Sequence, residues 1–478
     1  MTAARERLHS PLRGVAVHQL GSGPQPSSCG QLLTHSSGPA SPLKAKMATI
    51  AFYSTAHRGH LHPTFSLATL FRNAGHRVVY FVPGDAKAAV ESLDVEVRCY
   101  KGDPCWTLRD AAMRVVGDVF GLEVDRLIEE ELLFVQVLPA LVDLLSSVSG
   151  DLEEWAPDLV IYDSACPWAK IACRRLGIPA VSSCSSTVMA RAQQEEVCGF
   201  VATRPDTERC REFLRRVYAL EYDPVEVYCN YDDLTIVWSL PELQPHAKAL
   251  PSARFFGAGL PRREHVGDGS IIRWMQECRD RGKTIIYLSM GTVVGQEKWS
   301  VPTTDMLREV MREFAVDQDV AFVVSTGERS DPRALLRDGR ERFPDHFLVA
   351  RWVPQLAVLG ETDVFITHGG NNGFNEALFF GVPMLVVPVF GDQHMNGTTV
   401  ERLGLGATIR SPFAPNVSTD LSHVTGARIR NGLETIARNR AQIAEAIAVI
   451  QRKFLEKQEA FQANGLEELM RYAGNPRE

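Results

Sequence analysis

The fold of this chain is decided by residues 347–397, which read FLVARWVPQLAVLGETDVFITHGGNNGFNEALFFGVPMLVVPVFGDQHMNG. Residues 364–367 and 384–389 are continuous apolar runs rich in β-branched side chains, and such runs predict buried parallel strands. Between them lie a glycine turn at 368–370 and a predicted helix at 372–380 that ends before a glycine and a proline. The stretch therefore predicts a strand, turn, helix and strand, which is one unit of a doubly wound α/β sheet.

The glycine turn leaves backbone N–H groups at the N-terminus of a helix, where a phosphate binds readily. His368 can donate a hydrogen bond to a phosphate oxygen. Glu376, one turn beyond Asn372 on the same helix face, can accept from the two hydroxyls of a ribose. Trp352 offers a flat face to a base, and the amide of Gln355 can pair with a base or ribose edge. These side chains predict a nucleotide site.

Each residue of this predicted site also has a structural interpretation. A tryptophan such as Trp352, before a strand, is more often part of the core, and a lone histidine such as His368 is more often a partner within the fold. Glycine turns between strand and helix occur in every α/β protein. The nucleotide interpretation depends on the combination of these residues in this order and spacing.

The run from Thr367 to Asn396, THGGNNGFNEALFFGVPMLVVPVFGDQHMN, resembles the donor-site signature of nucleotide-sugar-dependent glycosyltransferases with the GT-B fold. It is more similar to the animal glucuronosyltransferases and bacterial macrolide glycosyltransferases than to the plant enzymes, which usually carry Trp in place of Asn371. Many members carry Ser or Thr in place of Gly373, so here we expect a backbone N–H to contact the phosphate instead. The resemblance extends more weakly from Met47 onward and implies two facing Rossmann-like domains, each with a doubly wound parallel sheet, and a cleft between them.

The resemblance implies a larger set of donor-binding residues. Ser289, Gly291 and Thr292 match the Ser-x-Gly-Ser/Thr turn that surrounds the phosphates and the base. Asp392 and Gln393 match the pair that holds the sugar hydroxyls, although Asp392 taken alone is also a common turn residue after a glycine. The complete predicted donor site consists of Ser289, Gly291, Thr292, Trp352, Val353, Gln355, His368, Gly370, Asn371, Asn372, Gly373, Glu376, Asp392 and Gln393.

Glycosyl transfer to a hydroxyl needs a base for the hydroxyl proton, and three histidines follow the first predicted strand. The family places its catalytic histidine in a Gly-His-x-x-Pro pattern, which is GHLHP at residues 59–63, so the resemblance implies that His60 is the base. His57 stays an open competitor, because Arg58 lengthens the loop relative to some members. His62 is expected to be structural.

A base of this kind works best when a carboxylate holds its other ring nitrogen, which fixes the tautomer and stabilises the cation. Asp163 is the family match, and it directly follows the predicted strand 159–162 of the same parallel sheet. The alternative for Asp163 is a cap of the helix that follows. No metal is predicted, because a helix N-terminus can carry the charge of the diphosphate.

Composition excludes several classes of protein. The hydrophobic content of 45% and charged content of 23% are those of an ordinary globular protein, and the formal net charge of −7 offers no basic surface for nucleic acid. The ten cysteines are scattered, several within apolar segments, which favours reduced thiols in a cytoplasmic protein over a disulfide framework. No apolar run reaches about eighteen residues, so no membrane span is predicted.

A length of 478 residues indicates two or three domains. Residues 1–46, rich in Ser, Pro, Gly and His, are predicted to be disordered, either as a segment upstream of a true start at Met47 or as a transit peptide. The predicted units are an acceptor-binding Rossmann-like domain at 47–250, whose first helix covers 63–74, a linker at 251–270, a donor-binding Rossmann-like domain at 271–455, and a C-terminal helix at 456–478. The resemblance places that last helix back on the first domain and makes residues 105–150 line the acceptor pocket.

The resemblance implies a metal-independent, inverting hexosyltransferase. It would move a hexose, glucose in the first instance, from a UDP-sugar to a hydroxyl of a small hydrophobic acceptor such as a polyketide, terpenoid, sterol or phenolic. The UDP-sugar is a co-substrate, no cofactor is expected, and the chain would be a monomer or weak homodimer. Whether the donor base is uracil or thymine stays open.

Two other classes compete with this interpretation. A non-catalytic partner that binds nucleotide-sugar or supports another glycosyltransferase would lose the base, whereas this chain keeps both His60 and Asp163. A nicotinamide-dependent oxidoreductase would need a glycine fingerprint after the first strand, where Gly59 stands alone.

Overall fold

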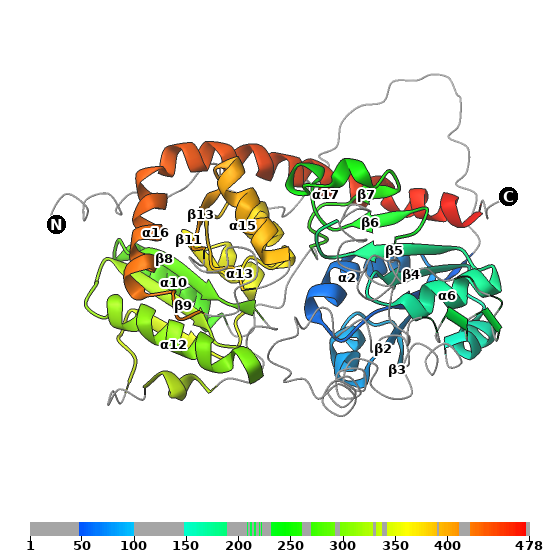
Figure 1. Ribbon diagram of the computed structural model, residues 1–478, viewed down its shortest axis with the longest axis horizontal. Helices are drawn as coiled ribbons and strands as arrows, with labels where there is room; N and C mark the ends of the chain where they lie inside the picture. Colours follow the sequence, from blue (N-terminus) through cyan, green and yellow to red (C-terminus); the bar gives the residue numbers. More distant parts are fainter. Residues whose placement is uncertain are drawn as a thin grey trace, which may run out of the picture.

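The computed structural model describes residues 47–99, 148–188, 231–260, 269–291, 297–327, 331–336, 342–389, 392–410 and 421–474, with isolated positions between 208 and 221. These residues form two α/β domains that stand side by side, each built on a parallel sheet, with one long helix running along both (Figure 1). This architecture confirms the predicted fold class.

The first domain has a seven-stranded sheet in the order β3-β2-β1-β4-β5-β6-β7. Its strands are β1 (Thr49–Tyr53), β2 (Arg77–Val82), β3 (Glu96–Cys99), β4 (Leu159–Asp163), β5 (Ala180–Cys184), β6 (Thr235–Val237) and β7 (Ala253–Phe255). Its described helices are α2 (Arg58–Asn73), α3 (Lys87–Glu91) and α6 (Pro167–Leu176), with short 3-10 turns η1 (Gly84–Ala86), η3 (Pro241–Leu243) and η4 (Ala247–Ala249). The strand order reverses between β1 and β4, and ligands of doubly wound sheets bind outside such a reversal.

The second domain has a six-stranded parallel sheet in the order β10-β9-β8-β11-β12-β13. Its strands are β8 (Thr284–Ser289), β9 (Val320–Ser325), β10 (Phe347–Ala350), β11 (Val364–Thr367), β12 (Met384–Val386) and β13 (Gly406–Thr408). Its helices are α10 (Ser270–Asp280), α12 (Glu297–Glu313), α13 (Gln355–Leu359), α14 (Asn371–Phe379), α15 (Asp392–Leu403) and α16 (Gly426–Arg438), with the 3-10 turn η5 (Pro332–Leu336). Here the order reverses between β8 and β11, so the turns after these two strands lie next to each other.

The two domains are joined by α17 (Arg440–Gly474), which begins against the second domain and ends on the first (Figure 1). Its first half buries Ile443 and Ile447 in the core of the second domain. Farther along, Phe461 packs edge-on against Trp238 of the first domain, with ring centroids 5.9 Å apart. Because one continuous helix is buried in both cores, it limits how far the domains can separate.

Several element boundaries differ from the sequence predictions. The helix predicted at 63–74 begins five residues earlier, at Arg58, so Pro63 lies inside α2 and His60 in its first turn. The strand predicted at 384–389 ends at Val386, because its neighbour β13 offers only three residues for pairing. Strand β7 adds residues 253–255 to the first sheet, within the segment predicted as linker. The predictions for residues 1–46, for most of 105–150 and for Thr292 concern positions outside the described residues.

Candidate active site

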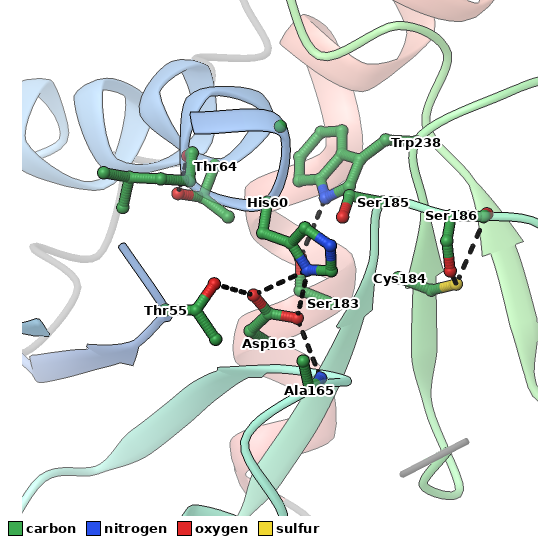
Figure 2. A network of polar contacts seen from close by, with 12 residues as sticks. Thr55, His60, Thr64, Asp163, Ala165, Ser183, Cys184, Ser185, Ser186 and Trp238 are labelled. Carbon is green, nitrogen blue, oxygen red and sulfur yellow. Dashed lines mark hydrogen bonds and ion pairs between the residues drawn. The ribbon is translucent and has the colours of Figure 1, made fainter. Parts of the chain in front are cut away.

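The predicted base and carboxylate meet at the strand reversal of the first sheet. Asp163 is the last residue of β4, and His60 lies in the first turn of α2, directly after β1. Nδ1 of His60 lies 2.9 Å from Oδ1 of Asp163, as Figure 2 shows. Asp163 is 3% exposed whereas His60 is 30% exposed, so the carboxylate is enclosed while the imidazole is partly accessible to solvent. With Nδ1 held by Asp163, Nε2 is the nitrogen that can take a proton.

The electrostatics of this pair suit a base. Burial by itself lowers the pKa of His60, but the charge and hydrogen bond of Asp163 outweigh burial and hold that pKa above its usual value. The negative charge of Asp392, from the other domain, acts in the same direction. Burial alone would raise the pKa of Asp163, yet His60 and the backbone N–H of Ala165 hold it below its usual range. The carboxylate therefore stays ionised and favours the imidazolium.

The geometry separates His60 from its neighbours. The ring of His57 lies 6.0 Å from that of His60, and His57 is the residue just before α2 rather than part of the pair. His62 is exposed and packs against the ring of Phe65. The helix-cap alternative for Asp163 is wrong, because the capping residue of α6 is Cys166.

Several residues that the sequence analysis did not identify form hydrogen bonds to Asp163 or to its sheet neighbour. Oγ1 of Thr55 donates to Asp163 at 3.3 Å, and the N–H of Ala165 donates at 2.9 Å. Ser183, the sheet partner of Asp163, accepts a 2.8 Å hydrogen bond from the indole N–H of Trp238 (Figure 2). The sequence carries no signal for these contacts, since they join separate strands and loops.

The predicted phosphate turn assembles at the strand reversal of the second sheet. Ser289 ends β8, and its Oγ accepts a 3.3 Å hydrogen bond from the N–H of Gly291. His368 follows β11, and its ring fits so tightly that a Cβ at Gly291 would lie 2.7 Å from its Nε2. Gly370 is the residue that precedes α14, so the first N–H groups of that helix open beside the ring.

The ring of His368 is neutral and has a buried nitrogen available for a ligand. Burial lowers the pKa of His368 to about 4, so its ring is neutral at pH 7. Its Nδ1 is buried and has no hydrogen-bond partner among the described residues. A buried ring nitrogen beside a helix N-terminus fits a phosphate oxygen as partner.

The residues predicted for the base and ribose also lie together. Nε2 of Gln355 donates to Oε2 of Glu376 at 2.5 Å, and Oε1 of Gln355 accepts from the hydroxyl of Tyr287 at 2.9 Å. Trp352 is 49% exposed, which rules out the core interpretation of this residue, whereas the adjacent Val353 is buried. Trp352 therefore offers a large aromatic face at the surface, three residues before Gln355 in the chain, and such a face can stack on a base.

Two predicted donor residues, Asn371 and Asn372, use their side chains between the domains. Nδ2 of Asn371 donates to the carbonyl of Ser185 at 2.9 Å, and Nδ2 of Asn372 donates to the carbonyl of Gly59 at 2.8 Å. Asn375, one turn farther along α14, donates to the carbonyl of Trp238 at 3.0 Å. The side-chain amides of Asn371 and Asn372 are therefore used in hydrogen bonds to the first domain. Any contact of these two residues with the donor would be made by their backbone N–H groups.

The predicted sugar-binding pair begins α15. Asp392 is the first residue of that helix, and its negative charge acts on His60 of the other domain. Gln393 is 3% exposed, and its Oε1 accepts from the N–H of Val389 at 2.9 Å, so its side chain also fixes the segment that follows β12.

The position of Gly373, where many relatives carry Ser or Thr, is buried in α14. A Cβ there would meet only ordinary contacts, the nearest 3.5 Å away on Phe365.

Two further features bear on cofactors and membranes. The sequence contains an Asp-x-Asp triplet at 317–319, a pattern that holds a metal in the metal-dependent glycosyltransferases. It lies between α12 and the start of β9, at the sheet edge opposite the predicted donor site, and Asp317 pairs with Arg430 at 2.8 Å. Among the described residues, no group of three or more His, Cys, Asp and Glu has metal-binding geometry. Within the same residues, no helix is long and apolar enough to cross a membrane.

Comparisons with known proteins place this chain among glycosyltransferases. Residues 250–442 match the family model described as UDP-glucoronosyl and UDP-glucosyl transferase. The chain is 27% identical over 414 residues to the oleandomycin glycosyltransferase of Streptomyces antibioticus, covering 83% of this chain and 87% of the relative. It is 25% identical over 377 residues to an uncharacterised UDP-glucosyltransferase of Bacillus subtilis, covering 76% of this chain and 85% of the relative.

Solved structures show the same architecture. The glycotransferase of kitacinnamycin superposes with a TM-score of 0.65 at 26% identity, covering 88% of this chain and 98% of that chain. The calicheamicin glycosyltransferase CalG4 superposes with a TM-score of 0.67 at 21% identity, covering 90% and 99%, and at that identity it supports the fold alone. These findings confirm the resemblance drawn from the sequence: residues 250–442 match the UDP-glycosyltransferase family model, and the chain is similar over most of its length to glycosyltransferases of the GT-B fold.

Proposed function

We propose that this protein transfers a hexose, glucose in the first instance, from a UDP-sugar to a hydroxyl of a small hydrophobic acceptor, with inversion at the anomeric carbon. The observation that carries the proposal is the 2.9 Å contact of His60 with Asp163, within the electrostatic reach of Asp392 from the donor domain. A base on one domain opposite a phosphate turn on the other is the arrangement that a single displacement needs.

The reaction would use the residues as follows. His60 Nε2 takes the proton of the acceptor hydroxyl while the acceptor oxygen attacks the anomeric carbon. Asp163 stabilises the imidazolium that forms. The bond to UDP breaks on the opposite face of the sugar, and the N-terminus of α14 with His368 receives the growing charge of the diphosphate. The proposal includes neither a metal nor any cofactor beyond the UDP-sugar.

The acceptor class is supported by the relatives. The curated relatives are named for oleandomycin and, in Solanum melongena, for anthocyanidin, both small hydroxylated molecules. A cytoplasmic location belongs to the same proposal and is supported by free thiols at Cys99, Cys166, Cys173, Cys184 and Cys278. We further propose that the protein is a monomer or weak homodimer and has no nucleic-acid or membrane partner.

The competing function is a non-catalytic partner that binds nucleotide-sugar. A mass-spectrometric screen of the purified protein separates the two, using UDP-glucose, UDP-glucuronic acid and dTDP-glucose with a mixed panel of hydroxylated natural products. We expect a hexose adduct from UDP-glucose on at least one acceptor, and loss of that adduct in Asp163→Asn. Binding of UDP-sugar without transfer to any acceptor would favour the partner.

A further inference from the structure

Helix α2 contains a proline whose position has a direct structural consequence. In an α-helix, each carbonyl accepts from the N–H four residues later. Pro63 lies inside α2 and has no N–H, so the carbonyl of Gly59 lacks its usual helical partner. Nδ2 of Asn372 donates to that carbonyl at 2.8 Å, from the other domain.

The two ends of this hydrogen bond lie beside the two halves of the candidate active site. Gly59 directly precedes His60 in the chain, so its carbonyl belongs to the peptide unit that begins the base residue. Asn372 is the second residue of α14, where the backbone N–H groups open toward the phosphate turn. One side-chain amide therefore connects the peptide before the base to the first turn of the donor helix.

The other asparagines of α14 act elsewhere. Asn371 holds the carbonyl of Ser185 after β5, and Asn375 holds the carbonyl of Trp238 after β6. Both contacts fix the donor helix on the sheet of the first domain. Asn372 differs because its partner is on the helix that carries His60, so it can act on the base without changing how the two sheets face each other.

We propose that Asn372 is a positioning residue for His60, and that Pro63 makes this possible by leaving the carbonyl of Gly59 open to it. The inference rests on the proposed function, in which His60 is the base. Pro63 touches neither reacting group in this account. It acts through the N–H that it lacks, which in any other residue would compete with Asn372 for the same carbonyl.

This proposal predicts opposite effects on stability and on rate. A proline in a helix interior weakens the helix, so Pro63→Ala should leave the melting temperature unchanged or raise it. The new N–H at residue 63 should capture the carbonyl of Gly59 and release Asn372, and we expect kcat to fall about tenfold. A purely structural role for Pro63 predicts no loss of rate when the fold becomes more stable.

The experiment is a double-mutant cycle in the full-length protein with Pro63→Ala, Asn372→Ala and the double variant. It measures kcat at saturating UDP-glucose with an acceptor from the screen, UDP affinity by calorimetry, and thermal unfolding. Pro302→Ala is the matched control, since Pro302 also lies inside a helix, α12, in the other domain. We expect Asn372→Ala to lower kcat about tenfold. Pro63→Ala should cost nothing further in that background, because the bond from residue 372 to the carbonyl of Gly59 is already absent.

Two results would overturn the proposal. One is wild-type kcat in Pro63→Ala, and the other is additive losses in the double variant. His60→Ala in the same assay separates this inference from the proposed function. If His60→Ala abolishes transfer while Pro63→Ala keeps the full rate, the positioning role fails and the base stands. If His60→Ala transfers normally, both fail.

Discussion

Gly291 and His368 pack so closely that a Cβ on the glycine would lie 2.7 Å from Nε2 of the histidine. Gly291 follows β8 and His368 follows β11, the two strands between which the order of the second sheet reverses. The glycine also has a φ of +73°, a conformation that other residues seldom adopt. The position of the histidine ring in the phosphate turn is therefore set by a residue on a different strand.

This relationship predicts that Gly291→Ala weakens donor binding beyond its effect on stability. The methyl group must displace His368, and we expect UDP affinity to fall at least about tenfold, which is about 1.4 kcal/mol. Gly282→Ala is the matched control, since Gly282 has a φ of +79° and open space around its Cβ position. Thermal unfolding should show a lower melting temperature in both variants, with the larger loss in Gly291→Ala because of the displaced ring, and calorimetric titration should show weaker UDP binding in Gly291→Ala alone. Equal UDP affinity in both would mean that the glycine serves the backbone alone.

The protonation of His368 should change when UDP binds. Its pKa in the free protein is lowered by burial from 6.5 to about 4, so this histidine adds stability above about pH 6.5 and loses it as pH falls toward 4. Two phosphate charges beside the ring should raise that pKa again. We expect UDP binding near pH 5.5 to take up as much as about one more proton in the wild type than in His368→Gln. Calorimetry in buffers of different ionisation enthalpy measures this difference in proton uptake. The same uptake in the wild type and in His368→Gln would mean that the phosphates do not lie beside His368.

Trp352 should contribute to affinity without contributing to stability. Because its side chain is 49% exposed, Trp352→Ala removes little core packing, and the melting temperature should hardly change. Loss of a stacked base should weaken UDP binding by roughly 1–2 kcal/mol. Quenching of tryptophan fluorescence by UDP in the wild type, and its loss in the variant, would show the contact directly. A normal UDP affinity in the variant would remove Trp352 from the donor site.

Replacing Asp392 and replacing Gln393 by alanine should have different effects on ligand binding and on stability. Asp392→Ala should weaken use of the intact UDP-sugar and leave binding of free UDP nearly unchanged, because Asp392 begins α15 and its charge acts on the base His60. Gln393→Ala should additionally lower the melting temperature, since its Oε1 accepts from the N–H of Val389 inside the fold. Comparing affinities for UDP-glucose and UDP in each variant tests this. Equal losses for both ligands in Asp392→Ala would contradict a sugar contact.

Local sequence pattern was sufficient to predict most strands of the fold and to place His60 near Asp163. The apolar runs that became β11 and β4 are buried on both faces, as parallel strands are, so their ends could be located from sequence. The ends of β1 and β4 meet at one sheet edge, which is why His60 and Asp163 could be placed together. Family resemblance then selected His60 from three neighbouring histidines, a choice that spacing alone could not make.

The contacts between the domains could not be predicted in this way. The sequence predicts that this helix begins at Pro63, whereas in the structure α2 begins at Arg58 and Pro63 lies in its interior, away from the first helical position where proline is most frequent. Asn375 was not singled out, although an asparagine buried within a short helix is unusual enough to suggest a specific partner. Its partners Trp238 and Ser239 are more than a hundred residues away in the chain, and no periodic pattern connects them.

The most direct test of the account is the rate at which His60→Ala transfers hexose from the UDP-sugar to an aliphatic alcohol acceptor, with His57→Ala measured beside it. A positioned base contributes about a hundredfold to ten-thousandfold, so we expect a loss of that size in His60→Ala and near wild-type transfer in His57→Ala. UDP affinity should stay unchanged in both, because the donor turn belongs to the other domain. Full transfer by His60→Ala, with or without a loss in His57→Ala, would contradict the assignment of His60 as the base.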